Sequence, residues 1–96
     1  MINVSVRSEM LIAKALGSRR LEIELPDDCD ILGMLLSLSE KHGDEFRSLI
    51  FSDDGEYRSD HNIILHNGRS ILAYDGVHNR LRDGDEVVIM PLVAGG

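Results

Sequence analysis

Hydrophobic and polar residues alternate over two stretches near the start of the chain. Residues 2–7 (INVSVR) and residues 20–25 (RLEIEL) both show this alternation, which is the period of a half-buried strand. The apolar positions of the two stretches are Ile2, Val4, Val6, Leu21, Ile23 and Leu25. We expect the two strands to pair antiparallel, with these side chains facing the core.

A helical pattern follows over residues 31–43 (ILGMLLSLSEKHG). Its apolar residues recur at helical spacing and are Ile31, Met34, Leu35 and Leu38. We expect Asp28 or Asp30 to be the N-cap, and Gly43 suits the left-handed position that ends a helix. Gly33 costs about 1 kcal/mol relative to alanine inside a helix. Either a close backbone approach compensates for this cost, or the helix begins later.

Two further apolar groups lie on either side of this pattern. Residues 8–17 (SEMLIAKALG) fit either a short helical turn or a wide loop packed on the core. The apolar group within residues 46–51 predicts one helical or 3₁₀ turn, followed by a polar loop around residues 53–55.

The last third of the chain predicts strands. The Asn67-Gly68 pair tolerates the positive φ angles of a type I′ turn, so residues 62–71 (NIILHNGRSI) are expected to form a hairpin. Residues 86–90 predict a final strand that follows an Asp-Gly turn. Pro91 has no N–H, and we expect it to stop the pairing of this strand.

Two strands, one main helix and a set of later strands predict an α+β fold in which a mixed sheet packs on that helix. We expect residues 1–90 to form one domain and residues 91–96 (PLVAGG) to be a flexible C-terminal tail. A final strand buried through Val87 and Ile89 would anchor this tail, which reaches on the order of 20 Å when fully extended.

Charge and composition exclude several classes of function. A formal charge of −7 on 96 residues, without a cluster of Lys and Arg, argues against nucleic-acid binding. The apolar runs are far shorter than the about 20 residues of a membrane span. Cys29 is the single cysteine and has no partner for an internal disulfide, so we expect a cytoplasmic protein. The acidity either confers only solubility or steers the domain toward a basic partner surface.

Patterns for catalysis or metal binding are weak. The acidic residues 53–60 lack the ligand alternation of an EF-hand, and the histidines show no metal-binding spacing. His66 is interpreted as a satisfied sheet residue rather than a ligand or a base. Cys29 precedes a helix N-terminus, where the pKa of a thiol can fall, but it has no catalytic partner in the sequence and is interpreted as structural. We therefore expect no metal and no bound cofactor.

The sequences HNGRSI and LRDGDEVVIMPLVAGG, taken together, resemble the C-terminal half of the MoaD/ThiS group of ubiquitin-like proteins. The resemblance implies a β-grasp fold, which agrees with the predicted order of elements. His66 stands where the family usually has valine, and Leu92 stands where MoaD proteins often have a second proline. Extra residues near 52–61 and 74–79 make the chain longer than a typical ThiS, and this length favours a MoaD-like protein.

The resemblance implies a function for the tail. A MoeB/ThiF-like adenylating enzyme would use ATP to make an acyl-adenylate on Gly96, and sulfur would then displace AMP to give a thiocarboxylate. A MoaE-like large subunit of molybdopterin synthase would use that sulfur on a pterin precursor. The chain would thus be a carrier and not an enzyme by itself. The partner-binding residues implied are Gly95, Ala94, Val93, Leu92, Pro91 and Met90, of which Met90 belongs to an apolar patch on the sheet or to ordinary packing.

Two other functions remain open. The resemblance leaves open an archaeal-type relative that also serves as a protein modifier, in which Gly96 would be joined to lysines of target proteins. This role and sulfur transfer do not exclude each other. Alternatively, the domain is a binding module whose tail is inert. Asp83, Asp85 and Glu86 either meet basic residues of a partner or form a solvated turn.

Overall fold

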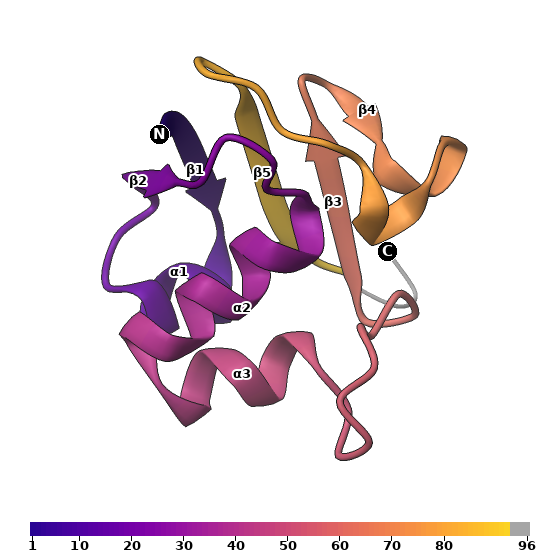
Figure 1. Ribbon diagram of the computed structural model, residues 1–96. Coiled ribbons are helices and arrows are strands. Elements are labelled where there is room, and N and C mark those ends of the chain that lie inside the picture. The colour runs from indigo at the N-terminus through magenta and orange to yellow at the C-terminus, as the bar shows by residue number, and fades with distance from the viewer. Residues whose placement is uncertain (93–96) are drawn as a thin grey trace.

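The computed structural model describes residues 1–92, which form a five-stranded mixed sheet with three α-helices on one face (Figure 1). The strands are β1 (Ile2–Ser8), β2 (Arg20–Leu25), β3 (Asn62–His66), β4 (Arg69–Ser70) and β5 (Glu86–Pro91). Their order across the sheet is β2-β1-β5-β3-β4. β5 pairs parallel with β1 and antiparallel with β3, so the last strand of the chain lies at the centre. The arrangement is a β-grasp fold, as expected.

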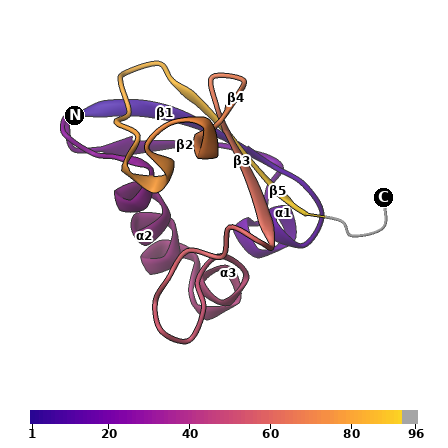
Figure 2. The same ribbon diagram turned by 90° about the vertical axis from the view of Figure 1, so that its right-hand side faces the viewer.

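The helices are α1 (Met10–Leu16), α2 (Ile31–His42) and α3 (Asp44–Ile50). They lie on the same side of the sheet, and the opposite face of the sheet is left open within the described part of the chain (Figure 2). Two 3₁₀ turns, Ile71–Ala73 and Gly76–His78, connect β4 to the long segment before β5. Within residues 1–92, no helix is long and apolar enough to span a membrane.

The start of α2 resolves the alternatives left by the sequence. The Asp30 side chain accepts a hydrogen bond from the Gly33 backbone N–H at 2.8 Å, so Asp30 rather than Asp28 is the N-cap. A Cβ atom at Gly33 would lie 2.7 Å from the Cys29 Sγ atom. The close approach that explains Gly33 therefore comes from the Cys29 side chain and not from the backbone. α2 begins at Ile31, where the sequence pattern placed it.

The core lies between the sheet and the helices. The predicted inner residues are buried, except for Leu21, which is half-buried; the buried ones are Ile2, Val4, Val6, Ile23, Leu25, Ile31, Met34, Leu35 and Leu38. Val87 and Ile89 of β5 have no exposed surface. The predicted hairpin is also present, with positive φ angles at Asn67 (51°) and Gly68 (86°).

Three local expectations are refined or corrected. Residues 8–17 contain a helix, α1, which buries Ile12 and Leu16. The apolar group before residue 51 forms a seven-residue helix, α3, rather than a single turn, because Phe46 and Ile50 are spaced so that both face the core. β5 ends at Pro91 and not at residue 90, since a proline keeps its carbonyl acceptor and lacks only the donor.

Candidate functional site

The tail begins at the end of β5, the central strand of the sheet. β5 is paired on both sides, by β1 and by β3, and its Val87 and Ile89 side chains are completely buried. Met90 and Pro91 are half-buried, and Leu92 is exposed. The predicted site residues Val93, Ala94, Gly95 and Gly96 lie outside the described residues. The structure therefore positions Pro91 and Leu92, which we call the base of the tail and from which these four residues continue.

Pairing does not stop at the proline. Pro91 lies opposite Asn62 in the antiparallel register, and the Leu92 backbone N–H donates to the His61 carbonyl oxygen at 2.8 Å. The expectation that Pro91 ends the pairing is therefore wrong. The missing proline N–H removes one donor, but the next residue can still donate. Leu92 is thereby held against the segment that precedes β3.

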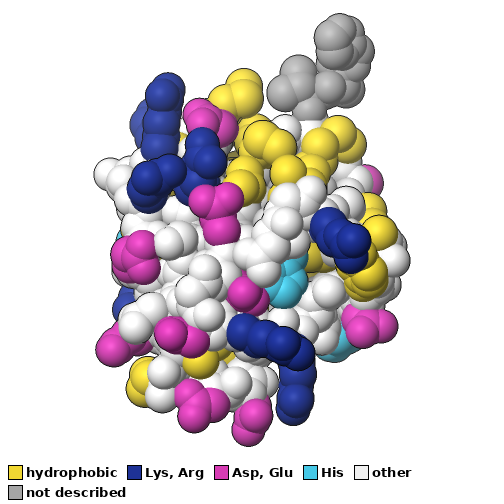
Figure 3. Space-filling model, turned by 90° about the horizontal axis from the view of Figure 1, so that it is seen from above, with side chains coloured by type: hydrophobic (Ala, Val, Ile, Leu, Met, Phe, Trp, Pro, Cys, Tyr) yellow, Lys and Arg dark blue, Asp and Glu magenta, His cyan; other side chains and the backbone are white. Residues whose placement is uncertain are grey.

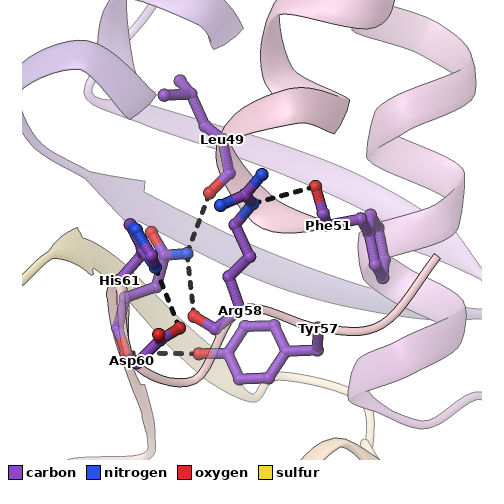
Figure 4. Close-up of polar contacts among 7 residues, drawn as sticks. Leu49, Phe51, Tyr57, Arg58, Asp60 and His61 are labelled. Atoms are coloured by element: carbon purple, nitrogen blue, oxygen red, sulfur yellow. Dashed lines mark hydrogen bonds and ion pairs between the residues drawn. The ribbon is translucent and has the colours of Figure 1, made fainter. Parts of the chain in front are cut away.

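A buried polar cluster fixes that segment (Figure 4). The Asn62 side chain is buried, and its amide donates to the carbonyl oxygens of Leu49 at 2.9 Å and Arg58 at 3.2 Å. The Tyr57 hydroxyl donates to the Asn62 carbonyl at 3.4 Å, and the Arg58 Nε atom donates to the Phe51 carbonyl at 3.1 Å. Burial raises the pKa of Tyr57 to about 12, so its hydroxyl stays a donor at neutral pH.

The sequence did not single out Asn62. Its position at the start of a strand carries no motif, and asparagine is usually exposed. A buried amide must be hydrogen-bonded, and here it joins the end of α3 to the loop over residues 52–61. The extra residues noted in this loop thus support the base of the tail.

Half-buried apolar side chains form a strip on the open face of the sheet. Met90 of β5 lies directly opposite Ile63 of β3, and Val88 lies opposite Leu65. All four alternate with inward-facing residues, so they point away from the helices. We call Ile63, Leu65, Val88 and Met90 the apolar strip. Met90 is therefore part of a surface beside the base of the tail, not of the core beneath the helices.

The tail base also borders a groove on the other side. This groove is lined by Leu11, Leu49, Arg58, Pro91 and Leu92, among others. Leu11 and Leu92 are 59% and 49% exposed, which is high for leucine. The two predicted binding residues Pro91 and Leu92 are thus accessible together at the point where the tail leaves the domain.

The acidic turn before β5 is mainly structural. Asp83 accepts from the Asn3 backbone N–H at 2.7 Å. Asp85 accepts from His66 Nε2 at 2.6 Å, from the Asn67 side chain at 3.0 Å and from the Arg82 backbone N–H at 2.8 Å. His66 is therefore a satisfied sheet residue, as predicted.

The environment of Asp85 sets its ionisation. Burial raises the pKa of its carboxyl, but the hydrogen bonds from Asn67, His66 and the Arg82 backbone outweigh burial and hold the pKa below its ordinary value. The ionised carboxylate ties the hairpin turn to the start of β5. Asp85 is one of the acidic residues considered as contacts for a basic partner, but its carboxylate already accepts hydrogen bonds within the domain.

The remaining candidates show no catalytic arrangement. Burial, together with the nearby Asp30 carboxylate, raises the pKa of the Cys29 thiol, whereas a reactive cysteine needs a lowered one. Among residues 1–92, no group of three His, Cys, Asp or Glu side chains is placed to hold a metal ion.

Comparison with known proteins agrees with this geometry. The ThiS family model matches residues 12–96. Small archaeal modifier protein 3 of Haloferax volcanii is 34% identical over 83 residues, which cover 86% of this chain and 87% of the relative. The crystal structure of small archaeal modifier protein 1 from H. volcanii superimposes with a TM-score of 0.84 at 26% identity, covering 97% of this chain and 100% of that one.

A second structure, described as the putative molybdopterin converting factor subunit 1 from Pyrococcus furiosus, has a TM-score of 0.77 at 26% identity. The superposition covers 97% of this chain and 100% of that one. The family-model match extends over the strip, the tail base and the final glycines. The chain therefore belongs to the ThiS family of small ubiquitin-like carrier and modifier proteins.

Proposed function

We propose that the chain is a sulfur carrier protein whose reactive group is the Gly96 carboxylate, which is adenylated and then converted to a thiocarboxylate. The observation that supports this most is the tail base. The central strand, the Leu92–His61 hydrogen bond and the buried Asn62 cluster all fix the point from which residues 93–96 continue. An inert tail would need no such support.

The chemistry requires activation, because a carboxylate is a poor electrophile. Attack of a Gly96 oxygen on the α-phosphate of ATP releases pyrophosphate and forms an acyl-adenylate. A sulfur nucleophile at the oxidation level of sulfide then attacks the acyl carbon, and AMP leaves with the bonding electrons. The adenylating partner supplies ATP and sulfur, and this chain supplies a narrow end without side chains, which suits a tight channel.

The apolar strip and the groove around Leu92 are the proposed contacts with partners. Met90, Pro91 and Leu92 present apolar area on both sides of the tail base, where an adenylating enzyme of the ubiquitin-activating type would bind. We propose molybdopterin synthesis as the destination of the sulfur, with a MoaE-like subunit as the second partner. The P. furiosus structure, described as a molybdopterin converting factor subunit, supports this choice.

A second function, conjugation of Gly96 to lysines of other proteins, is supported by the small archaeal modifier proteins. It uses the same acyl-adenylate and differs only in the nucleophile, an amine instead of sulfur. Gly-Gly remnants on lysines of proteins from the native host would support conjugation. Their absence, with a thiocarboxylate present, would leave sulfur transfer alone.

Deletion of Gly96 tests the shared activation step. The purified adenylating enzyme of the same genome should catalyse ATP–pyrophosphate exchange with the full chain and not with the deletion variant. The fold should be unchanged, because the described sheet, helices and core are built from residues 1–92. Exchange that persists after the deletion would refute the proposal.

A further inference from the structure

One row of paired residues crosses the open face of the sheet. Arg20 of β2 lies opposite Arg7 of β1, Arg7 lies opposite Val88 of β5, and Val88 lies opposite Leu65 of β3. The row thus has a basic half, Arg20 and Arg7, and an apolar half that belongs to the apolar strip. Two arginines directly opposite one another on neighbouring strands destabilise a sheet.

The fold does not neutralise this pair. Within residues 1–92, neither Arg7 nor Arg20 forms an ion pair with a carboxylate. Glu22, which follows Arg20 on the same face, accepts a hydrogen bond from the Ser5 hydroxyl at 2.7 Å instead. Both arginines are exposed. Their charges are therefore available to another molecule.

Charge is also polarised along the open face. The next row away from the tail contains Glu22, Ser5 and Glu86, whereas the arginine row lies toward the end at which β5 finishes. Since β1 and β5 run parallel, the end of β1 that carries Arg7 lies at the same edge of the sheet as the C-terminal end of β5. In the space-filling view, Lys and Arg side chains gather next to hydrophobic ones on this part of the surface (Figure 3).

We propose that Arg7 and Arg20 are the charged half of a docking surface and that its occupant is an acidic patch on the adenylating partner, with carboxylates opposite the arginines and apolar side chains opposite the strip. This inference rests on the proposed function. Guanidinium groups bind carboxylates through paired N–H donors. The net charge of −7 would repel an acidic partner at long range. The attraction therefore acts only at short range and requires carboxylates of the partner to lie opposite the two arginines.

Charge reversal with a matched control tests the surface. The double variant R7E/R20E is compared with K41E/R47E, which changes the net charge equally at exposed positions on the helical side. ATP–pyrophosphate exchange is measured with the purified adenylating enzyme of the same genome over a range of carrier concentrations. We expect the KM for R7E/R20E to rise on the order of 10- to 100-fold with kcat within about twofold, and the control to change by less than about threefold.

The neutral variant R7Q/R20Q separates binding from folding. It removes the like-charge pair, so its Tm should equal or exceed that of the wild type, while its KM still rises. Equal KM values for R7E/R20E and K41E/R47E, or a KM for R7Q/R20Q like that of the wild type, would overturn the inference. Absence of exchange with the wild type itself would instead refute the proposed function.

Discussion

The backbone N–H of Leu92 donates a hydrogen bond to the carbonyl oxygen of His61 at 2.8 Å, one residue beyond the proline that ends β5. The base of the tail is consequently tied to the loop before β3 as well as to the central strand. Asn62 holds this loop by two hydrogen bonds. The starting point of the last four residues is therefore set by contacts that are distant from β5 in the sequence.

The first prediction concerns this support. Asn62→Ala removes the side-chain donor to the Leu49 carbonyl and one of two donors to the Arg58 carbonyl, which keeps the His61 backbone N–H. We expect the substitution to lower the free energy of unfolding by about 1–3 kcal/mol. The variant should also exchange the Leu92 amide hydrogen faster than the wild type does, and by a larger factor than for the amides of β5. Thermal unfolding and NMR hydrogen exchange measure the two effects. Asn3→Ala, at an exposed position of β1, is the control and should change neither.

An unchanged Leu92 exchange rate in a destabilised Asn62→Ala variant would contradict this account. It would show that Asn62 stabilises the loop without holding the tail base.

The second prediction concerns the contact between Gly33 and Cys29. Gly33→Ala gains up to about 1 kcal/mol of helix propensity, but its Cβ atom meets the Cys29 sulfur at 2.7 Å. We expect Gly33→Ala to be more favourable in a Cys29→Ala background than in the wild type, by at least about 0.5 kcal/mol. Chemical unfolding of the four proteins gives this coupling energy. Equal effects in both backgrounds would mean that the Cys29 side chain rotates away from the new Cβ atom without a cost in free energy.

The third prediction concerns pH. The pKa of Asp85 is lowered in the folded protein, so its contribution to stability is present above the unfolded pKa of about 3.9 and is lost as the pH falls through the folded value. We expect the Tm of the wild type to fall more steeply below about pH 4 than that of Asp85→Asn. Thermal unfolding between neutral and acidic pH measures this difference. Parallel curves for the two proteins would show that Asp85 does not contribute.

Sequence periodicity predicted the fold because the sheet has one buried face. The alternation in β1 and the helical spacing in α2 directly reflect which side chains reach the core. The turn residues Asn67 and Gly68 identified the hairpin through their need for positive φ. These features are local, and each can be read within a few residues.

The support of the tail could not be predicted in the same way. The Leu92–His61 hydrogen bond and the Asn62 cluster join segments that come together only when β3 pairs with β5. The opposition of Arg7 and Arg20 likewise depends on the register of β1 and β2. Resemblance to a family predicted Gly96 as the reactive end, but the contacts that position the base of the tail are tertiary.

The measurement that tests the central claim most directly is the intact mass of the C-terminus in protein purified from its native host. The account predicts a fraction of molecules in which sulfur replaces one oxygen of the Gly96 carboxylate, and the loss of this fraction when the adenylating enzyme is deleted. Finding only the unmodified carboxylate, in cells that contain the active enzyme and make molybdopterin, would contradict it.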